Sequence, residues 1–486
     1  MVEKPRNLTP KSENFSEWYL QILSAAELVE DRYNVKGFYI MRPWLMEIVD
    51  RIYSVWEKEL KEKGHGKVLF PTVIPEENFE KEKEHVEGFT PEVFWITEAG
   101  GTKFERKLAL RPTSETAMYS VYPYWVRSHE DLPLKCFQSC SVFRYETKAT
   151  KPLIRLREFL WIEAHDAFAT EEEALAQVKS DMDTTATVLN HFNVPVLFFR
   201  RPDWDKFNGA VSTFAADTML PDGKRLQLPS THYLGQNFSK AFGIKFTDKD
   251  EQEKFVHQTC YGPPISRTAA TIISLHSDDF GLSLPFSVAP IQIVIVPILK
   301  KGSEEAVLCY AKEISERLKE YFVKIDDRDE SPGSKFYKWE IRGVPVRLEV
   351  GLRETEEKTV SIFRRDKREK SQAKIEDMEQ AIKAIEKSIE ENLCVRAKEY
   401  FKERIFEAET IDGLKEKIEK GFVKVPFCSR EIDGKACAET LKEIAEIAGT
   451  VYPDEENTPS GARPQGKKCI ACGREAKEYV YCCRSY

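Results

Sequence analysis

The chain has 486 residues, of which 41% are hydrophobic and 32% charged, and its formal net charge is −8. This length suits two to four domains of roughly 100–200 residues each, and the hydrophobic content excludes a mainly disordered or collagen-like chain. The longest apolar stretch, residues 287–299, contains two prolines and is shorter than the ~20 residues that cross a bilayer. No apolar signal segment follows the charged start, so we expect a globular cytoplasmic protein without a membrane anchor.

The first half of the chain predicts an α+β arrangement. Apolar periodicity predicts helices at residues 44–61 and 171–190, and Thr170 is expected to be the N-cap of the second. Strand patterns occur at residues 67–75, 107–111, 135–145, 156–169 and 194–200. Because a polar, basic segment joins 135–145 to 156–169, these two strands are predicted to form an antiparallel hairpin with a long connection.

The second half predicts a separate α/β unit followed by a cysteine-rich tail. Strands are expected at residues 291–296, 323–325, 345–350 and 359–363, with helices between them, and a charged helical stretch at 371–405. We therefore expect domains at residues 1–284, 285–400 and 401–486.

The hairpin carries residue types that suit a nucleotide. The chain contains neither a Gly-x-x-x-x-Gly-Lys-Ser/Thr loop nor a Gly-x-Gly-x-x-Gly turn after a strand, so a nucleotide must be held in another way. Arg144 and Arg155 offer bidentate phosphate contacts, Glu146 can accept from an adenine amino group, and Phe159 can stack on a purine. On residue types alone, a salt-bridged antiparallel pair remains the alternative.

Six of the eleven cysteines lie near the end of the chain: Cys428, Cys437, Cys469, Cys472, Cys482 and Cys483. Two residues separate Cys469 from Cys472, a spacing that lets both sulfurs face one ion, and Cys428 with Cys437 completes a tetrahedral set for structural Zn²⁺. A redox pair is the alternative, although the thioredoxin-like βαβ context is missing. Cys482 and Cys483 are either substitute ligands or buried thiols.

Five segments occur together in the order that is typical of one enzyme family. They are Arg111-Pro-Thr-Ser-Glu-Thr, Phe143-Arg-Tyr-Glu-Thr-Lys with Pro152-Leu-Ile-Arg-Leu-Arg-Glu-Phe, His232-Tyr-Leu-Gly-Gln-Asn-Phe-Ser-Lys, Val288-Ala-Pro-Ile-Gln and Pro332-Gly-Ser-Lys-Phe-Tyr-Lys-Trp-Glu. The chain thereby resembles the class II aminoacyl-tRNA synthetases, and specifically the prolyl-tRNA synthetase family of the archaeal and eukaryotic type, along nearly its whole length.

The resemblance implies an antiparallel-sheet catalytic domain, an α/β anticodon-binding domain and a small α/β zinc-bearing C-terminal domain. It implies a homodimer, with Pro43 as the interface proline of motif 1, and ATP-dependent attachment of L-proline to tRNA(Pro) through a prolyl-adenylate, with Mg²⁺. Only about a hundred residues separate Glu163 from Arg267, so no inserted editing domain is expected.

The resemblance also implies site residues. The proline site is expected to comprise Thr113, Glu115, Arg144, Trp161, Glu163 and His232. The ATP site is expected to comprise Arg144, Glu146, Arg155, Phe159, Gln227, Ser230 and Arg267, of which Arg144 and Arg267 are the catalytic pair on the α- and γ-phosphates. Without the resemblance, Thr113 would be interpreted as a helix N-cap, Trp161 as core and His232 as a structural histidine.

Residues 331–370 have an excess of basic over acidic side chains, which indicates either a solvated surface or a surface for RNA. The resemblance favours an anticodon surface with Lys338, Glu340 and Arg347. Three details depart from the family pattern: four residues between Gly262 and Arg267, Ser277 in place of a glycine, and Leu228-Pro229 before Ser230. A non-catalytic binding paralogue, or a related enzyme charging threonine or glycine, remains an alternative.

Overall fold

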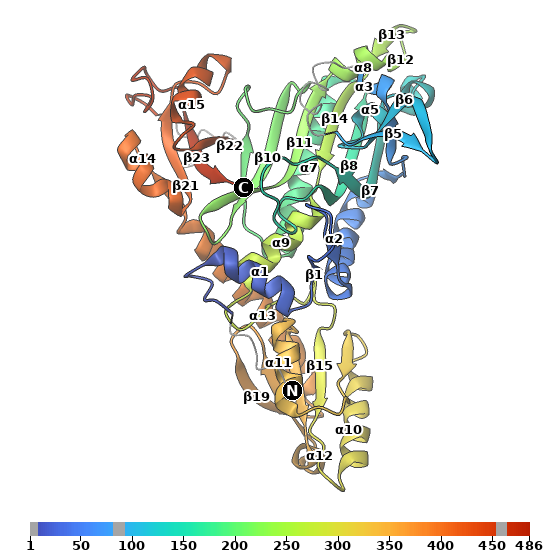
Figure 1. Ribbon diagram of the computed structural model, residues 1–486, viewed down its shortest axis with the longest axis vertical. Coiled ribbons are helices and arrows are strands. Elements are labelled where there is room, and N and C mark those ends of the chain that lie inside the picture. Colours follow the sequence, from blue (N-terminus) through green and yellow to red (C-terminus); the bar gives the residue numbers. More distant parts are fainter. Residues whose placement is uncertain (1–7, 81–92, 453–463) are drawn as a thin grey trace.

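The computed structural model describes residues 8–80, 93–452 and 464–486. Its largest element is an eleven-stranded sheet in the order β20-β21-β23-β22-β9-β10-β11-β14-β8-β7-β3 (Figure 1). The strands of this sheet are β3 (Gly66–Lys67), β7 (Leu134–Phe143), β8 (Glu158–Phe168), β9 (Leu197–Arg200), β10 (Ser212–Met219), β11 (Lys224–Gly235), β14 (His257–Gly262), β20 (Ile405–Glu407), β21 (Phe422–Phe427), β22 (Glu446–Val451) and β23 (Glu478–Ser485). It joins strands from the first half of the chain to strands from its end.

Helices cover one face of the catalytic part of this sheet. Along β8, Ile162 and Ala164 face a core that contains apolar residues of α2 (Pro43–Glu62), α7 (Glu171–His191) and α9 (Ile265–His276). Side chains alternate between the faces of a strand, so Trp161 and Glu163 lie on the opposite face. That face is left for the site.

Smaller elements surround this layer. They are α1 (Phe15–Ala25), β1 (Val29–Glu30), β2 (Ile40–Met41), β4 (Val73–Pro75), α3 (Glu76–Glu80), β5 (Trp95–Ala99), β6 (Thr102–Leu110), α5 (Glu115–Met118), α6 (Tyr122–Trp125), the 3₁₀ turn His129–Asp131, α8 (Asn237–Phe242), β12 (Lys245–Thr247) and β13 (Glu253–Phe255). The prediction of one strand at 67–75 is wrong, because β3 and β4 belong to different sheets with Pro71 between them. Proline lacks the N–H that a continuous ladder needs.

A five-stranded sheet, ordered β16-β15-β17-β18-β19, forms a second unit in the lower part of Figure 1. Its elements are β15 (Ile293–Pro297), α10 (Glu304–Arg317), β16 (Val323–Ile325), α11 (Pro332–Ile341), β17 (Val346–Val350), α12 (Leu352–Glu357), β18 (Thr359–Arg364), β19 (Glu369–Lys374) and α13 (Met378–Lys402). The expected helix at 371–405 therefore starts later, after a strand. The residues of β19 are nearly all exposed, so this strand has no alternation that the sequence could reveal.

The remaining elements continue the large sheet. They are α14 (Ile411–Lys417), the 3₁₀ turns Ile418–Lys420 and Ile432–Gly434, and α15 (Lys435–Leu441), which pack beside β20–β23. Because β22 pairs with β9 through Thr450 and Val451, the C-terminal strands and the catalytic strands share one hydrogen-bonded layer. No helix within the described ranges is both long and apolar enough to cross a membrane.

The predicted start of α7 is confirmed. The Thr170 hydroxyl accepts from the Glu173 N–H at 3.2 Å, and the Glu173 carboxylate accepts from the Thr170 N–H at 3.2 Å. This reciprocal capping satisfies two donors that the helix itself leaves unpaired.

Helix α7 also carries a buried acid, Asp181, which accepts hydrogen bonds from Gln177 and from Thr231 on β11, both at 2.7 Å. Burial, followed by the charge of Asp166, raises the pKa of Asp181 to about 7. Between about pH 4 and pH 7 the folded state therefore binds more protons than the unfolded state, and this contribution to stability is lost as pH rises through that window.

Replacing Asp181 with Asn is expected to raise the free energy of unfolding near pH 8 by about 2 kcal/mol and to change it little near pH 4. Guanidinium titrations at both pH values measure the difference. Asp183→Asn is the matched control, since Asp183 lies on the exposed face of the same helix and pairs with Lys179. Equal destabilisation of Asp181→Asn at both pH values would contradict the expectation.

Candidate active site

The hairpin of β7 and β8 aims Arg144. The strands pair from Leu134 with Ala167 to Phe143 with Glu158, and the Arg144 N–H then donates to the Arg157 carbonyl at 3.0 Å. The Arg144 Nε–H donates to the Pro112 carbonyl at 3.0 Å. The guanidinium carbon lies 5.4 Å from the Phe159 ring centroid and 5.7 Å from that of Trp161. A side chain fixed by its backbone and its Nε–H has little rotamer entropy left to lose on binding an anion.

A cavity of about 230 Å³ opens at this end of the hairpin. Seven of the residues predicted to bind substrates line it: Arg144, Glu146, Arg155, Phe159, Trp161, Gln227 and Arg267. They come from the hairpin, from β11 and from the first turn of α9. Pro264 and Ser266 also line the cavity; they follow Gly262 in the segment whose length departs from the family pattern, which is why sequence reasoning did not assign them.

Three arginines concentrate positive charge in this cavity. Arg267 donates to the carbonyls of Ile154 at 3.0 Å and Gln227 at 3.1 Å. Burial, with the charges of Arg144 and Arg155, lowers the pKa of Arg267 to about 10. A bound polyanion would relieve the repulsion among these three guanidinium groups.

Glu146 and Phe159 lie beside these arginines. The Glu146 carboxylate is 3.6 Å from Arg155 Nε and accepts from the Lys148 N–H at 2.9 Å. The rings of Phe159 and Trp161 meet edge to face at 5.4 Å. The salt-bridged pair is therefore present, and the Phe159 ring lies beside it as part of the same cavity lining.

A second group of predicted residues forms a buried polar floor. Thr113 Oγ1 donates to Glu115 and lies 3.4 Å from Glu163. Ser114 donates to Glu163 from its N–H at 2.8 Å and from its hydroxyl at 3.2 Å. Ser114, not Thr113, precedes α5 as its N-cap residue, and its side chain makes no capping bond, so the N-cap interpretation of Thr113 is wrong.

Two residues that sequence reasoning missed complete this floor. His165 Nε2 lies 3.1 Å from Glu163, and Cys260 Sγ donates to Glu115 at 3.1 Å. Burial opposes the charged imidazolium, yet the charge of Glu115 and the hydrogen bond that His165 makes to the Glu163 carboxylate raise the pKa of His165. Strand alternation could have indicated His165, two residues after Glu163 on β8, whereas no sequence signal indicated Cys260.

His232 lies on β11 with both ring nitrogens engaged. Thr213 Oγ1 is 2.9 Å from Nδ1, Ser230 Oγ is 3.1 Å from Nε2, and the Phe207 ring centroid is 4.6 Å from that of His232. Ser230 is thus placed beside His232 and is not part of the cavity lining. Trp161 Nε1 is buried and has no hydrogen-bond partner within the described ranges.

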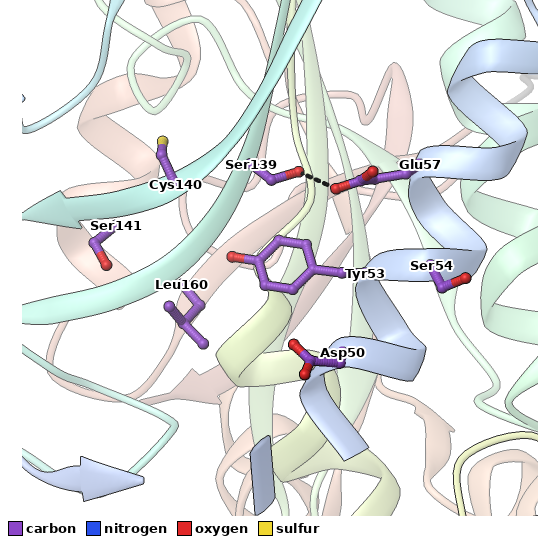
Figure 2. A pocket seen from close by; sticks show the side chains of 8 residues that line it. All are labelled: Asp50, Tyr53, Ser54, Glu57, Ser139, Cys140, Ser141 and Leu160. Atoms are coloured by element: carbon purple, nitrogen blue, oxygen red, sulfur yellow. Dashed lines mark hydrogen bonds between the residues drawn. The ribbon is translucent and has the colours of Figure 1, made fainter. Parts of the chain in front are cut away.

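On the side of the hairpin away from the site, α2 packs against the same strands. Figure 2 shows Tyr53, Glu57 and Ser139 around a separate cavity of about 530 Å³. The Ser139 hydroxyl donates to Glu57 at 2.7 Å, and the Tyr53 hydroxyl donates to the Trp161 carbonyl at 3.4 Å. The helix that begins at Pro43 therefore contacts the backbone of a residue that lines the site.

The predicted anticodon residues lie in the second unit. Lys338 and Glu340 are on α11, where Arg368 donates to the Glu340 carboxylate at 2.7 Å. Arg347, on β17, is 5% exposed and its guanidinium lies 4.1 Å from the ring centroids of both Phe336 and Phe363. Its guanidinium also donates to the Glu349 carboxylate, at 2.9 and 3.1 Å.

The four predicted cysteine ligands converge. The sulfurs of Cys428, Cys437, Cys469 and Cys472 all lie within 4.8 Å of one another, close to the ~3.8 Å separation of thiolates around tetrahedral Zn²⁺. Gly473, at φ +72°, allows the tight turn after Cys472. Cys482 and Cys483 are buried in β23, outside this cluster. Four sulfur donors without a disulfide fit a structural zinc ion.

Three family models match the chain. The tRNA synthetase class II core domain (G, H, P, S and T) matches residues 94–276, the anticodon binding domain matches residues 292–385, and the prolyl-tRNA synthetase C-terminal domain matches residues 411–486.

Similar proteins agree over the full length. The chain is 54% identical to the proline–tRNA ligase of Thermofilum pendens over 98% of both chains, and 43% identical to that of Pyrococcus horikoshii over 100% of both. A structure of Giardia lamblia prolyl-tRNA synthetase in complex with prolyl-adenylate has a TM-score of 0.93 and 37% identity, covering 99% of this chain and 100% of that one. The chain belongs to the prolyl-tRNA synthetase family of class II aminoacyl-tRNA synthetases.

Proposed function

We propose how individual residues carry out the reaction of this family, the ATP-dependent attachment of L-proline to tRNA(Pro) through a prolyl-adenylate. The observation that carries the proposal is the cationic cavity joined, through Trp161, to a buried floor of two carboxylates. Residues 163–267, all of which the structure describes, form strands and helices of the catalytic layer and leave no inserted editing domain.

Proline binds above the floor formed by Thr113, Glu115 and Glu163. The carboxylates of Glu115 and Glu163 supply negative charge that can pair with the secondary ammonium of proline, and His165 and Thr113 hold the Glu163 carboxylate in place. Trp161 packs on the pyrrolidine ring, and His232, held by two hydroxyls, closes the other side. Arg144 receives the proline carboxylate at the junction with the ATP cavity.

ATP binds in the cavity with its adenine on Phe159 beside Glu146, while Gln227 completes the nucleotide side and Ser230 contacts it from outside the cavity lining, beside His232. Arg144, Arg155 and Arg267 hold the phosphates, with Mg²⁺ arriving as part of the ATP complex. The proline carboxylate attacks the α-phosphorus and pyrophosphate leaves. The terminal ribose hydroxyl of the tRNA then loses its proton and attacks the carbonyl carbon of the mixed anhydride, and AMP leaves. Fixed positive charge and positioning accelerate both transfers, so no covalent enzyme nucleophile is needed.

We further propose a cytoplasmic homodimer with a structural Zn²⁺ held by Cys428, Cys437, Cys469 and Cys472. The exposed edge near β3, where the Leu69 side chain is 80% exposed, supports a dimer surface beside α2, and light scattering measures its mass. The domains are taken as residues 1–284, 285–400 and 401–486. Lys338, Glu340 and Arg347 are proposed to meet the anticodon.

Proline-dependent ATP–pyrophosphate exchange, screened over all twenty amino acids, tests the assignment. Exchange dominated by proline supports it. Exchange dominated by threonine or glycine would favour a related class II specificity, and folded protein without any exchange would favour a non-catalytic paralogue.

Gly262 offers a sharper test of the proline pocket. A Cβ atom at Gly262 would lie 2.4 Å from Trp161 Cζ2, so Gly262→Ala must displace the indole. We expect the KM for proline to rise about ten-fold, with a smaller rise in the KM for ATP. Gly333→Ala is the matched control, because a Cβ there meets nothing within 4 Å. Unchanged kinetics in Gly262→Ala would show that Trp161 does not contact proline.

A further inference from the structure

The loop that follows α9 is held between the catalytic layer and the anticodon domain. Gly281 has φ +143°, and a Cβ there would lie 2.6 Å from Ile341 Cα at the end of α11. The Leu282 N–H donates to the Ile341 carbonyl at 3.1 Å, and the Leu284 N–H donates to the Gly343 carbonyl at 3.3 Å. The two domains therefore meet here backbone to backbone.

A partly buried ion pair closes this contact, with the Arg365 side chain 1% and the Asp278 side chain 28% exposed. Arg365, at the end of β18 and 1% exposed, donates to both carboxylate oxygens of Asp278, at 2.8 and 2.5 Å. Its Nε–H donates to the Glu340 carbonyl at 3.3 Å. Burial opposes ionisation of Asp278, but the hydrogen bonds and charge of Arg365 lower its pKa, so the pair stays charged. Removing Asp278 would leave the buried Arg365 guanidinium without its partner.

The catalytic side holds the same loop independently. Trp18 of α1 donates from Nε1 to the Asp278 carbonyl at 3.1 Å. Lys11 donates from Nζ to the Ser277 carbonyl at 2.8 Å and from its N–H to the Asp279 carboxylate at 2.7 Å. Asp278 is thus linked through its backbone to the catalytic layer and through its side chain to the anticodon domain.

Helix α9 connects this loop to the ATP cavity. Arg267 lies in the first turn of α9 and Asp278 lies two residues beyond the last, a separation of about 17 Å along a helix axis. All but two residues of this helix are buried, so it can be displaced only as a whole. A shift of the loop would therefore strain the hydrogen bonds from Arg267 to the Ile154 and Gln227 carbonyls, which hold its guanidinium beside Arg144 and Arg155.

We propose that Arg365 is a positioning residue for ATP. Its ion pair with Asp278 fixes the position of α9, and the position of α9 fixes that of the Arg267 guanidinium. Most residues proposed to contact proline lie on other elements: Glu115 on α5, Trp161 and Glu163 on β8, and His232 on β11. The ion pair is therefore expected to act more strongly on ATP binding than on proline binding. The inference rests on the role proposed for Arg267. The inference also means that one ion pair joins the domain that binds the anticodon to the helix that carries an ATP-binding residue.

Kinetics of pyrophosphate exchange with the full-length chain test this inference. Arg365→Met is expected to raise the KM for ATP about five-fold and to change the KM for proline less than about two-fold. The charge swap Asp278→Arg with Arg365→Asp is expected to recover at least half of the loss. Arg364→Met is the matched control, because the neighbouring Arg364 makes the same bidentate pair with Asp366, at 2.8 Å, inside the anticodon domain.

An unchanged KM for ATP in folded Arg365→Met, or an equal rise in Arg364→Met, would overturn the inference. So would an equal rise in both KM values. If Arg365→Met does not fold, Arg365→Lys replaces it. An intermediate rise in the KM for ATP is then expected, and an unchanged KM for ATP would overturn the inference. Arg267→Ala distinguishes failure of the proposed ATP site from failure of this inference. If Arg267→Ala binds ATP normally, Arg267 is not an ATP ligand. If Arg267→Ala loses ATP binding while Arg365→Met keeps it, Arg365 does not position Arg267.

Discussion

Replacing Arg144 with alanine is expected to lower the rate of proline-dependent pyrophosphate exchange about a thousand-fold, the largest kinetic effect of any single substitution in the site. Arg144 is the residue proposed to contact both the proline carboxylate and the α-phosphate, and its Nε–H donates to the Pro112 carbonyl, which fixes the direction of the guanidinium. Charge developing on the phosphorus oxygens meets this fixed cation without reorganisation.

The accompanying variants separate charge from geometry. Arg144→Lys keeps the charge but not the planar donor pair, so we expect it to recover only part of the rate. Arg353→Ala, on the exposed surface of α12, controls for the loss of an arginine as such. Exchange within about ten-fold of the parent rate in folded Arg144→Ala would show that another group stabilises the transition state.

The second large effect is expected on stability. One Zn²⁺ per chain should be found by elemental analysis, and Cys469→Ser should lower the content below about 0.1 per chain and unfold the elements around β21–β23. Cys428, Cys437 and Cys469 belong to the apolar core of that region. Loss of the ion would leave thiols at the centre of a core too small to fold on its own.

Hydrogen exchange of β21–β23, measured alongside metal content, distinguishes the outcomes. Cys309→Ser serves as the control, because Cys309 is exposed on α10, remote in sequence from the four cysteines. If purified protein carries no zinc and Cys469→Ser keeps the parent protection, the cluster is a set of packed thiols. If the parent protein carries no zinc and Cys469→Ser loses protection in β21–β23, Cys469 stabilises these strands by packing and not as a metal ligand.

The hairpin and its arginines were predictable because their signals are local. Thr170 capping, the strands on either side of Arg144 and the Cys469–Cys472 spacing each depend on neighbours within a few residues, and the structure contains all three. The combination of motifs in family order then indicated which distant segments would meet, and the cavity lining contains Gln227 and Arg267 together with the hairpin residues.

Other features depend on packing that no single segment encodes. His165 and Cys260 complete the polar floor only because β8 and β14 pair in a register that places His165 opposite Cys260. The exposed strand β19 has no buried face that would give its sequence an alternating apolar pattern. The helix expected at residues 371–405 therefore included part of this strand. Pairing of β22 with β9 joins residues that are about 250 positions apart in sequence, beyond any local pattern.

The route of the chain through the large sheet has a mechanical consequence. The chain leaves the catalytic layer after α9, builds the five-stranded sheet and α13, and re-enters the same layer at β20 (Figure 1). The anticodon domain is therefore an insertion tethered at both ends, unlike a terminal appendage on one linker. A single tether lets a domain swing through a cone of directions, whereas two tethers confine it to rocking about the line that joins their anchor points. Any motion that follows anticodon capture consequently has one axis, and it passes beside the base of α9.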